Sequence, residues 1–291
     1  MKKILITGAN SYIGTSLDKW LNQWPDQYIV HTIDMLDPSW KEKDFSHYDV
    51  VFHVAGIAHA DTNKVNRETQ ELYYRVNRDL TKETAKKSKK DGVKQFIFMS
   101  SIIVYGDSSP IGKARVITRE TVPEPSNFYG DSKLQAEKGI IPLQSDDFNV
   151  VILRPPMIYG NGSKGNYPKL VSYAKKLPVF PNIKNKRSML HIDNLCEFIR
   201  LMIDNEEKGF FFPQNKEYVN TSEMVKLIAE VHGKKILLTQ VFNPAIHLLG
   251  IFIRIINKAF GSLVYEECLS NYKDDYRIRN LVDSIRITER K

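Results

Sequence analysis

The sequence predicts an α/β fold in which a doubly wound parallel sheet is joined to a smaller C-terminal α/β lobe. Short apolar strands alternate with amphipathic helical patterns over the first half of the chain, which is typical of a parallel sheet. The 291 residues, 42% of them hydrophobic, are enough to build one such sheet and a second lobe. The first strand leads at once into a turn of small residues and a helix, an order that often opens a parallel α/β sheet.

This first turn is predicted to bind an anion. The apolar run 4–6 indicates a buried strand. A helical face follows, made of Ile13, Leu17, Trp20, Leu21 and Trp24. The N–H groups and dipole of a helix start favour negative charge, while Gly8 permits a sharp turn and Gly14 lets helix and strand approach closely. Ser11 stands where the common G-x-G-x-x-G pattern has its middle glycine, so an ordinary βα turn is the alternative.

A second strand is predicted at 28–33, and Asp34 follows it. An acidic side chain about 20 residues beyond a glycine turn can accept hydrogen bonds from a ribose 2′-hydroxyl. The same carboxylate would repel a 2′-phosphate, which favours NAD over NADP. The alternative is a loop aspartate before the turn at Asp37-Pro38.

The third and fourth strands are predicted at 50–55 and 95–100. The small pair Ala55-Gly56 at the end of the third leaves room for a cofactor, and Ser100-Ser101 places hydroxyls at the end of the fourth. Ligands of open α/β sheets bind beyond these carboxyl ends. In the helix predicted between them, Leu72, Val76 and Leu80 are spaced for one face. Asn77 on that helix is either a surface residue or an amide that braces the site.

A tyrosine and a lysine share one face of the next predicted helix. The proline-containing segment 106–127 lacks periodicity and is predicted to be a loop that covers a site. The helix then opens at Phe128, and Tyr129 and Lys133 are four residues apart on it. The ordinary pKa of tyrosine, about 10, is too high for proton transfer at neutral pH, and a neighbouring ammonium would lower it. Because Tyr-x-x-x-Lys is common by chance, a coincidence is the alternative.

The chain is expected to leave the sheet after a strand at 149–153, where Arg154-Pro155-Pro156 cannot continue a ladder. We therefore predict a cofactor-binding domain at 1–158, with a returning segment near 188–210, and a substrate-binding lobe at 159–291. The glycine-rich segment 159–167 is a candidate substrate loop. Arg187 could pair bidentately with a phosphate.

Composition narrows the function classes. The net charge of +8 and pI of about 9.2 favour anionic partners, but no nucleic-acid-binding module is recognised. The two cysteines, Cys196 and Cys268, lack a partner motif, so neither a disulfide framework nor a metal site is expected. With no signal peptide in the opening residues, a cytoplasmic location is predicted.

The apolar segment 236–253 contains no Asp, Glu, Lys or Arg. Polar residues and Pro244 interrupt it, so a membrane span, and with it stable insertion, is not expected. A buried or dimer-forming helix is the simpler prediction, and a shallow contact with a membrane surface is the alternative.

Four motifs, taken in chain order, resemble the extended short-chain dehydrogenase/reductase family. They are most similar to its nucleotide-sugar epimerase/dehydratase branch. The motifs are Thr-Gly-Ala-Asn-Ser-Tyr-Ile-Gly, Ser-Ser-Ile-Ile-Val-Tyr-Gly, Tyr-Gly-Asp-Ser-Lys and Arg-Pro-Pro-Met-Ile-Tyr-Gly. The resemblance implies a Rossmann-like sheet. It also implies Tyr129 as the catalytic acid/base, Lys133 as its pKa-lowering partner and Ser101 as the group that binds the reacting oxygen.

The resemblance further implies the binding residues. The cofactor pyrophosphate is assigned to Gly8, Ser11 and Gly14, and Asn10, Tyr12 and Ile13 are also assigned to the cofactor site. Asp34 is assigned to the adenosine ribose, and Ala55, Gly56 and Asn77 to the edge beside the cofactor, while Lys133 also binds the nicotinamide ribose. The sugar substrate is assigned to Ser101, Tyr129, Lys164, Asn166 and Arg187, with Arg187 on the nucleotide diphosphate.

The implied function is an NAD(P)-dependent oxidoreductase that acts at C4 of a UDP-sugar. Ile103 stands where UDP-galactose epimerases usually carry threonine, and no Asp-Glu or Glu-Glu pair follows Ser101, which disfavours dehydration. The short chain and its Lys-Gly-Asn-Tyr segment are similar to enzymes of bacterial polysaccharide operons. We therefore expect a UDP-4-keto-6-deoxy-N-acetylhexosamine 4-reductase.

A 4-epimerase of a UDP-hexose or UDP-N-acetylhexosamine is the first alternative to this reductase. A non-catalytic NAD(P)-binding regulatory protein is the second. Family habit also suggests a homodimer formed through paired helices.

Overall fold

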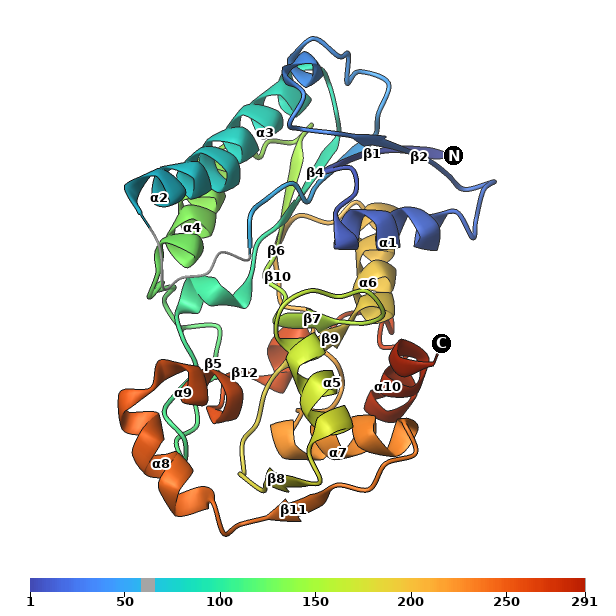
Figure 1. Cartoon of the computed structure of the whole chain (residues 1–291). Helices are drawn as coiled ribbons and strands as arrows, with labels where there is room; N and C mark the ends of the chain where they lie inside the picture. The colour runs from blue at the N-terminus through green and yellow to red at the C-terminus, as the bar shows by residue number, and fades with distance from the viewer. Residues whose placement is uncertain (59–65, 291) are drawn as a thin grey trace. The chain divides into compact units, whose positions relative to one another are not determined.

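The computed structural model describes residues 1–58 and 66–290, which form two compact units (Figure 1). The first unit comprises Met1–Gly106, Val122–Pro155 and Leu195–Pro213. The second comprises the remaining segments, 107–121, 156–194 and 214–291. Each unit therefore draws on stretches of chain that are far apart in the sequence.

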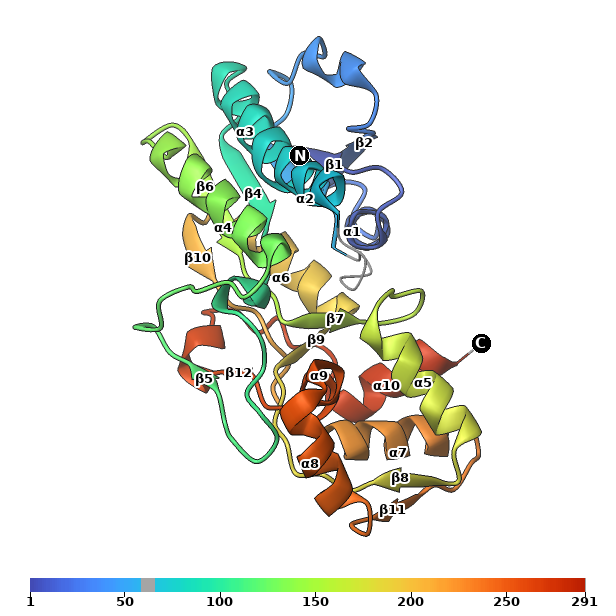
Figure 2. The ribbon, with the colours of Figure 1, turned by 60° about the vertical axis from the view of Figure 1, so that its left-hand side comes forward.

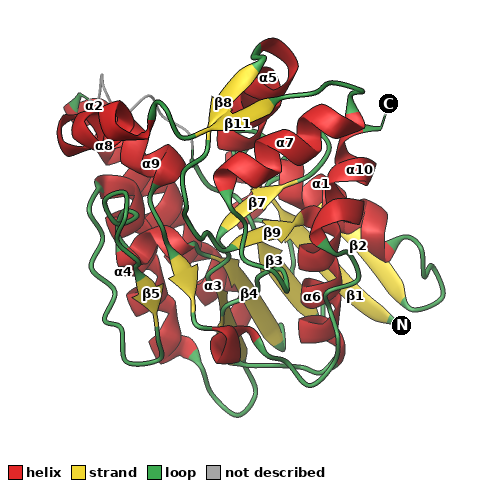
Figure 3. Cartoon of the chain, turned by 90° about the horizontal axis from the view of Figure 1, so that it is seen from below, coloured by secondary structure: helices red, strands yellow, loops and turns green. Residues whose placement is uncertain are grey.

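The first unit is built on a six-stranded sheet in which every pairing is parallel. The strand order is β10-β6-β4-β3-β1-β2. The strands are β1 (Lys2–Thr7), β2 (Tyr28–Ile33), β3 (Val50–His53), β4 (Gln95–Met99), β6 (Asn149–Leu153) and β10 (Gly209–Phe211). The predicted doubly wound parallel sheet is confirmed, and Figure 3 shows β4, β3, β1 and β2 side by side.

The order of the strands places a switch point at β1. From β1 the chain first adds β2 on one side and then crosses over to add β3 on the other. Ligands of such sheets bind in the crevice where the direction of winding reverses, beyond the carboxyl ends of the strands. The turns that follow β1 and β3 therefore flank the expected ligand position.

Helices cover both faces of this sheet (Figures 1 and 2). One face carries α1 (Tyr12–Leu21) and α6 (Ile192–Asp204), which are joined by a hydrogen bond from Trp20 Nε1 to Glu197 Oε2 of 3.1 Å. The other face carries α2 (Arg67–Tyr73), the π-helix η3 (Tyr74–Asp79), α3 (Leu80–Lys90) and α4 (Phe128–Ile140). Between sheet and helices lies an apolar core that includes Val51, Phe96, Phe98, Ala85, Ala136 and Ile140. Short 3₁₀ turns lie at η1 (Pro38–Lys41), η4 (Ile102–Tyr105) and η5 (Ile141–Leu143).

The second unit combines short parallel strand pairs with helices. The pairs are β5 (Val116–Ile117) with β12 (Val264–Tyr265), β7 (Met157–Tyr159) with β9 (Met189–His191), and β8 (Val179–Pro181) with β11 (Leu237–Thr239). The helices are α5 (Asn166–Lys176), α7 (Thr221–Val231), α8 (Asn243–Phe252), α9 (Arg254–Phe260), α10 (Leu281–Glu289) and the 3₁₀ turn η6 (Glu267–Ser270). Tyr159, Tyr167, Met224, Ile228 and Ile285 are buried in its core.

The apolar segment 236–253 forms β11, a turn and α8. Gly250 is the one buried residue of α8, so the prediction of a helix buried within this chain is wrong, while a dimer-forming helix stays a prediction. Among the residues that the structure describes, no helix is both long and apolar enough to cross a membrane.

Candidate active site

The turn after β1 depends on a glycine at position 8. Gly8 has φ +90°, and a Cβ atom there would lie 2.9 Å from the backbone nitrogen of Ala55. Only glycine allows both the conformation and the close approach of the turns that follow β1 and β3. Gly8 N and Ala9 N donate to Ile33 O at 3.0 and 3.1 Å, which ties the turn to the end of β2. Asn10 completes the turn with φ +66°.

The turn delivers the chain into the N-terminus of α1. Ser11 is the N-cap, and its Oγ accepts a hydrogen bond from Gly14 N at 3.1 Å. A Cβ atom at Gly14 would lie 3.2 Å from Ile6 Cγ2, so glycine lets α1 pack tightly on β1. Tyr12 and Ile13 contribute first-turn N–H groups, which have no acceptor within the helix. Because the Ser11 hydroxyl caps the helix as an acceptor, its hydrogen can still be donated to a ligand.

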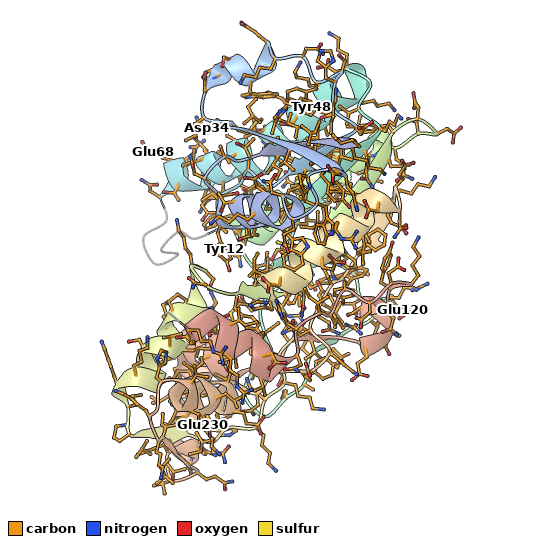
Figure 4. The ribbon with its side chains drawn as sticks, turned by 90° about the vertical axis from the view of Figure 1, so that its right-hand side faces the viewer. Tyr12, Asp34, Tyr48, Glu68, Glu120 and Glu230 are labelled. Atoms are coloured by element: carbon orange, nitrogen blue, oxygen red, sulfur yellow. The ribbon has the colours of Figure 1, made fainter. Side chains whose placement is uncertain are left out.

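Asp34 is exposed directly after β2 (Figure 4). Its Oδ1 accepts a hydrogen bond from Leu36 N at 2.9 Å, so the side chain also closes a local turn. The two interpretations of Asp34 are therefore compatible, since Oδ2 retains its lone pairs for a ribose hydroxyl.

Asn77 braces the turn after β3. Its Oδ1 accepts from Ile57 N at 2.9 Å and its Nδ2 donates to Ile57 O at 3.0 Å. The amide is fully buried, so the interpretation of Asn77 as a surface residue is wrong. A Cβ atom at Gly56 would lie 3.0 Å from Asn77 Oδ1 and 3.1 Å from Lys133 Nζ, which keeps this position small. Ala55, also small, is buried beside it.

The predicted catalytic side chains Ser101 and Tyr129 meet within the first unit. Ser101 follows β4 and caps η4, with its Oγ accepting from Ile103 N at 3.3 Å. Asn127 caps α4 by accepting from Gly130 N at 2.9 Å, so Tyr129 occupies the first turn of the helix. A Cβ atom at Gly130 would lie 2.7 Å from Ile103 O, which shows how closely α4 approaches η4. The Ser101 hydroxyl is close enough to the Tyr129 phenol to act against the rise in its pKa.

Burial dominates the electrostatics of both Tyr129 and Lys133. Burial raises the pKa of Tyr129 to about 12, and the hydrogen bond from Ser101 opposes this rise. Burial likewise lowers the pKa of Lys133 to about 8, while the nearby Glu137 carboxylate acts in the opposite direction. The Lys133 ammonium donates to Met99 O at 2.9 Å and lies 4.7 Å from the centre of the Phe98 ring.

The expected lowering of the Tyr129 pKa by Lys133 is therefore not present in the structure. The ammonium is engaged by the end of β4, and burial of the phenol outweighs the opposing hydrogen bond from Ser101. A helical spacing of four places the two residues on one face, but it does not fix where a long lysine side chain ends.

A buried ion pair beside these residues was not predicted from the sequence. Arg154 Nη2 contacts Glu137 Oε2 at 2.6 Å, and Arg154 Nε contacts Glu137 Oε1 at 3.1 Å. The Ser100 hydroxyl donates to the same carboxylate, and Arg154 Nη1 donates to the Tyr105 hydroxyl at 2.6 Å. The sequence offered one signal for this ion pair: Glu137 lies one helical turn beyond Lys133, on the same face of α4.

The predicted sugar-binding residues belong to the second unit. Arg187 Nη1 donates to Lys258 O at 2.5 Å and to Gly261 O at 3.4 Å, and burial lowers the pKa of its guanidinium. Lys164 is exposed in the turn before α5, and Asn166 lies in the first turn of that helix. Their assignment to the sugar substrate stays a prediction.

The residues of the first unit fit a dinucleotide. Gly8 and Gly56 keep side chains out of the space beside the ends of β1 and β3, and α1 offers its positive N-terminus. Asp34 can accept from a ribose, and the Lys133 ammonium lies beside Gly56. These groups come from separate strand ends and meet at the switch point of the sheet.

Comparison with known proteins identifies curated relatives and solved structures. A UDP-glucose 4-epimerase of Vibrio cholerae is 35% identical over 250 residues, which cover 78% of this chain and 75% of the relative. The N-acetyl-alpha-D-glucosaminyl-diphospho-ditrans,octacis-undecaprenol 4-epimerase of Escherichia coli O157:H7 is 27% identical over 266 residues, which cover 84% and 75%. The UDP-glucuronic acid 4-epimerase of Bacillus cereus, solved with NAD, has the same fold with a TM-score of 0.75 and 18% identity, covering 99% of this chain and 97% of the other.

A family model assigns this chain to a family, and the relatives above support that assignment. The model of the NAD dependent epimerase/dehydratase family matches residues 4–211, which include every cofactor-binding and catalytic residue predicted above. The chain therefore belongs to the NAD dependent epimerase/dehydratase family, and it is an enzyme that uses NAD or NADP.

Proposed function

We propose that this enzyme exchanges a hydride and a proton at C4 of a UDP-sugar. The observation that carries the proposal is the close approach of η4, which carries Ser101, to the start of α4, which carries Tyr129, with the buried Lys133 ammonium beside Gly56. These three side chains stand at the carboxyl end of β4 and on the first two turns of α4. Both relatives named above are 4-epimerases of sugars linked to diphosphates. Their names support C4 as the reacting carbon.

Each side chain has a distinct role at C4. With its pKa raised to about 12, Tyr129 carries its proton at neutral pH and can donate it to the oxygen of a C4 ketone. In the oxidative half of an epimerisation, the ionised form of Tyr129 would take the proton from the C4 hydroxyl as the hydride leaves. Ser101 hydrogen-bonds that oxygen as charge develops on it. The Lys133 ammonium holds a ribose hydroxyl beside Gly56. A bound nicotinamide would supply the hydride chemistry.

The second unit supplies the residues that we assign to the sugar diphosphate. An arginine has five N–H donors, and the two carbonyls bound to Arg187 engage only one of its terminal nitrogens. The remaining donors suit a diphosphate. Lys164 and Asn166, both at the start of α5, would contact the sugar or its phosphates.

Asp34 favours NAD over NADP in this proposal. Its exposed carboxylate follows the glycine turn and would repel a 2′-phosphate. NAD should therefore bind more tightly than NADP, and Asp34→Ala should reduce that difference.

Between the two C4 reactions, we favour the 4-epimerase over the 4-ketoreductase that the sequence motifs predicted. The support is the Vibrio cholerae relative, which covers most of this chain. The reductase remains a second candidate because of the Arg-Pro-Pro-Met-Ile-Tyr-Gly and Lys-Gly-Asn-Tyr segments.

Cofactor stoichiometry separates the two reactions. The enzyme is incubated with UDP-glucose, with UDP-N-acetylglucosamine and with a UDP-4-keto-6-deoxy sugar, and products are identified by proton NMR. An epimerase inverts C4 without net change in the absorbance of reduced nicotinamide. Equimolar consumption of NADH or NADPH with the keto sugar alone would identify the reductase, and no turnover with any of them would overturn the proposal.

A further inference from the structure

The second unit exposes an apolar surface on α8. This surface, here called the α8 surface, comprises Val241, Phe242, Leu248, Leu249, Ile251, Phe252 and Ile253. Several of its side chains are largely exposed, with 79% of Val241, 73% of Ile251 and 77% of Phe252 accessible. Isolated exposed apolar residues are ordinary, but seven of them within the segment 241–253 point to an interaction surface.

The exposed side chains are held by a fixed backbone. Asn257 of α9 donates from Nδ2 to Gly250 O at 2.6 Å, and its Oδ1 accepts from Ile111 N at 3.2 Å. Asn243 Nδ2 donates to Asn182 O at 2.9 Å and anchors the start of α8. Figures 1 and 2 show α8 and α9 side by side at the edge of the second unit. The apolar face is therefore presented outward by a helix whose inner face is already occupied.

The width of the apolar face favours a fluid partner over a second helix. At about 100° per residue, Leu248, Leu249, Ile251 and Phe252 cover close to half of the helix circumference. A helix that pairs with a second helix in a coiled coil presents a narrower stripe than this, whereas one that packs on a protein core presents about 100° or more. A lipid surface can cover a half-cylinder because acyl chains adapt to its shape.

The charge around α8 matches an anionic surface. No Asp or Glu occurs between Val231 and Tyr265, whereas Lys234, Lys235, Arg254 and Lys258 do. Lys258 is exposed on α9, which packs beside α8, whereas Lys234 and Lys235 are exposed in the turn between α7 and β11, away from α8. Lysines and arginines that flank an apolar helix face are the composition of helices that lie in a lipid headgroup layer.

We propose that the α8 surface docks the second unit onto a membrane surface that contains anionic phospholipid. The ten residues of α8 extend about 15 Å, half of the hydrocarbon thickness, so the helix lies on the bilayer and does not cross it. The proposal goes beyond the enzyme's reaction and does not depend on it, because the catalytic side chains belong to the other unit.

Vesicle flotation of the full-length protein tests the docking. We expect co-flotation with phosphatidylcholine vesicles that contain phosphatidylglycerol, weaker binding to phosphatidylcholine alone, and release as salt is raised. The double variant Ile251→Glu/Phe252→Glu should bind at least tenfold more weakly.

The matched control is Leu36→Glu/Val122→Glu, which adds the same charge at apolar side chains of the first unit that are 87% and 77% exposed. This control should float as the wild type does, and thermal unfolding should show that both double variants are folded. Absence of wild-type binding to anionic vesicles, or equal loss of binding in both double variants, would overturn the proposal.

Light scattering after size exclusion addresses a second copy of the chain as the occupant. A wild-type dimer that becomes monomeric in Ile251→Glu/Phe252→Glu, together with no vesicle binding, would assign the α8 surface to self-association and overturn membrane docking.

Discussion

Tyr129 keeps its proton far above neutral pH, because its hydroxyl is buried. We predict that Tyr129→Phe lowers kcat by about 10²–10⁴-fold, the usual contribution of a positioned acid or base, while NAD affinity changes little. Steady-state kinetics and a titration with NAD measure the two effects. Tyr48→Phe is the control, since that hydroxyl bonds His31 at 3.0 Å on the edge strand. Unchanged turnover in Tyr129→Phe would contradict the catalytic assignment.

His53 makes the first unit sensitive to acid. Burial lowers its pKa from 6.5 to about 3, with the Lys133 charge as a second cause. Its Nδ1 and Nε2 are paired with the hydroxyls of Thr7 at 2.8 Å and Thr81 at 3.0 Å. Below pH 6.5 the unfolded chain binds a proton that the folded chain does not take up until about pH 3. The free energy of unfolding should therefore fall as pH drops through this window.

The expected contribution of His53 is a loss of about 2 kcal/mol in the free energy of unfolding between pH 7 and pH 5. Urea titrations at the two pH values measure it. His53→Gln has no titrating ring but retains an amide donor and acceptor, so its loss between the two pH values should be smaller by this amount. An identical loss in both proteins would show that His53 is not the source.

At the scale of the element, the turn between β1 and α1 can be tested with two glycines of similar conformation. Gly8 has φ +90° and faces the backbone of Ala55, whereas Gly92 has φ +86°, and a Cβ atom there would have no neighbour within 4 Å. Gly92→Ala should cost only the left-handed strain, about 1–2 kcal/mol, and bind NAD normally. Gly8→Ala should in addition weaken NAD binding by more than tenfold, as measured by calorimetry. Equal NAD affinity in the two variants would remove Gly8 from the cofactor site.

The ion pair of Arg154 and Glu137 connects the end of β6 to α4. Both side chains are buried, so Arg154→Met should lower the free energy of unfolding by about 3–5 kcal/mol by leaving a buried carboxylate without its partner. Adding Glu137→Gln removes that charge and keeps an acceptor for Ser100. The double variant should therefore be more stable than Arg154→Met in urea unfolding. A double variant that is no more stable would mean that packing of the arginine, and not its charge, is what matters.

At the scale of the whole molecule, the central strands could be predicted because the residues that define each strand are neighbours in the sequence. The predicted ranges for β2 and β6 agree with the structure at every residue, since apolar runs bounded by turn residues carry that signal. The strand β10 was missed, because Gly209–Phe211 is only three residues long and its partner β6 lies more than fifty residues away.

Burial was harder to predict than secondary structure. Leu72, Val76 and Leu80 have the spacing of one helix face, but only Leu80 packs against the core, and Tyr73, Asn77 and Thr81 are the fully buried residues. Asn77 and Thr81 are polar and are buried because Ile57 and His53 satisfy them, which no pattern of hydrophobicity records. In the opposite sense, α8 is apolar yet exposed. The composition of a helix does not tell whether protein or another medium surrounds it, so this exposure could not be predicted from the sequence.

The π-helical turn 74–79 fixes the rotational phase of the long helical segment that crosses the sheet. Such a turn closes its hydrogen bonds one residue later than an α-helix does, so it contains one residue more than regular winding would need. Removing that residue would restore regular winding with α2 and α3 still in phase, so the change would fall on the turn itself and on the placement of Asn77. Insertions and deletions within this turn should accordingly be far less tolerated than substitutions on its outer side. The Asn77 amide can form its two hydrogen bonds with Ile57 only when the turn points it toward the end of β3.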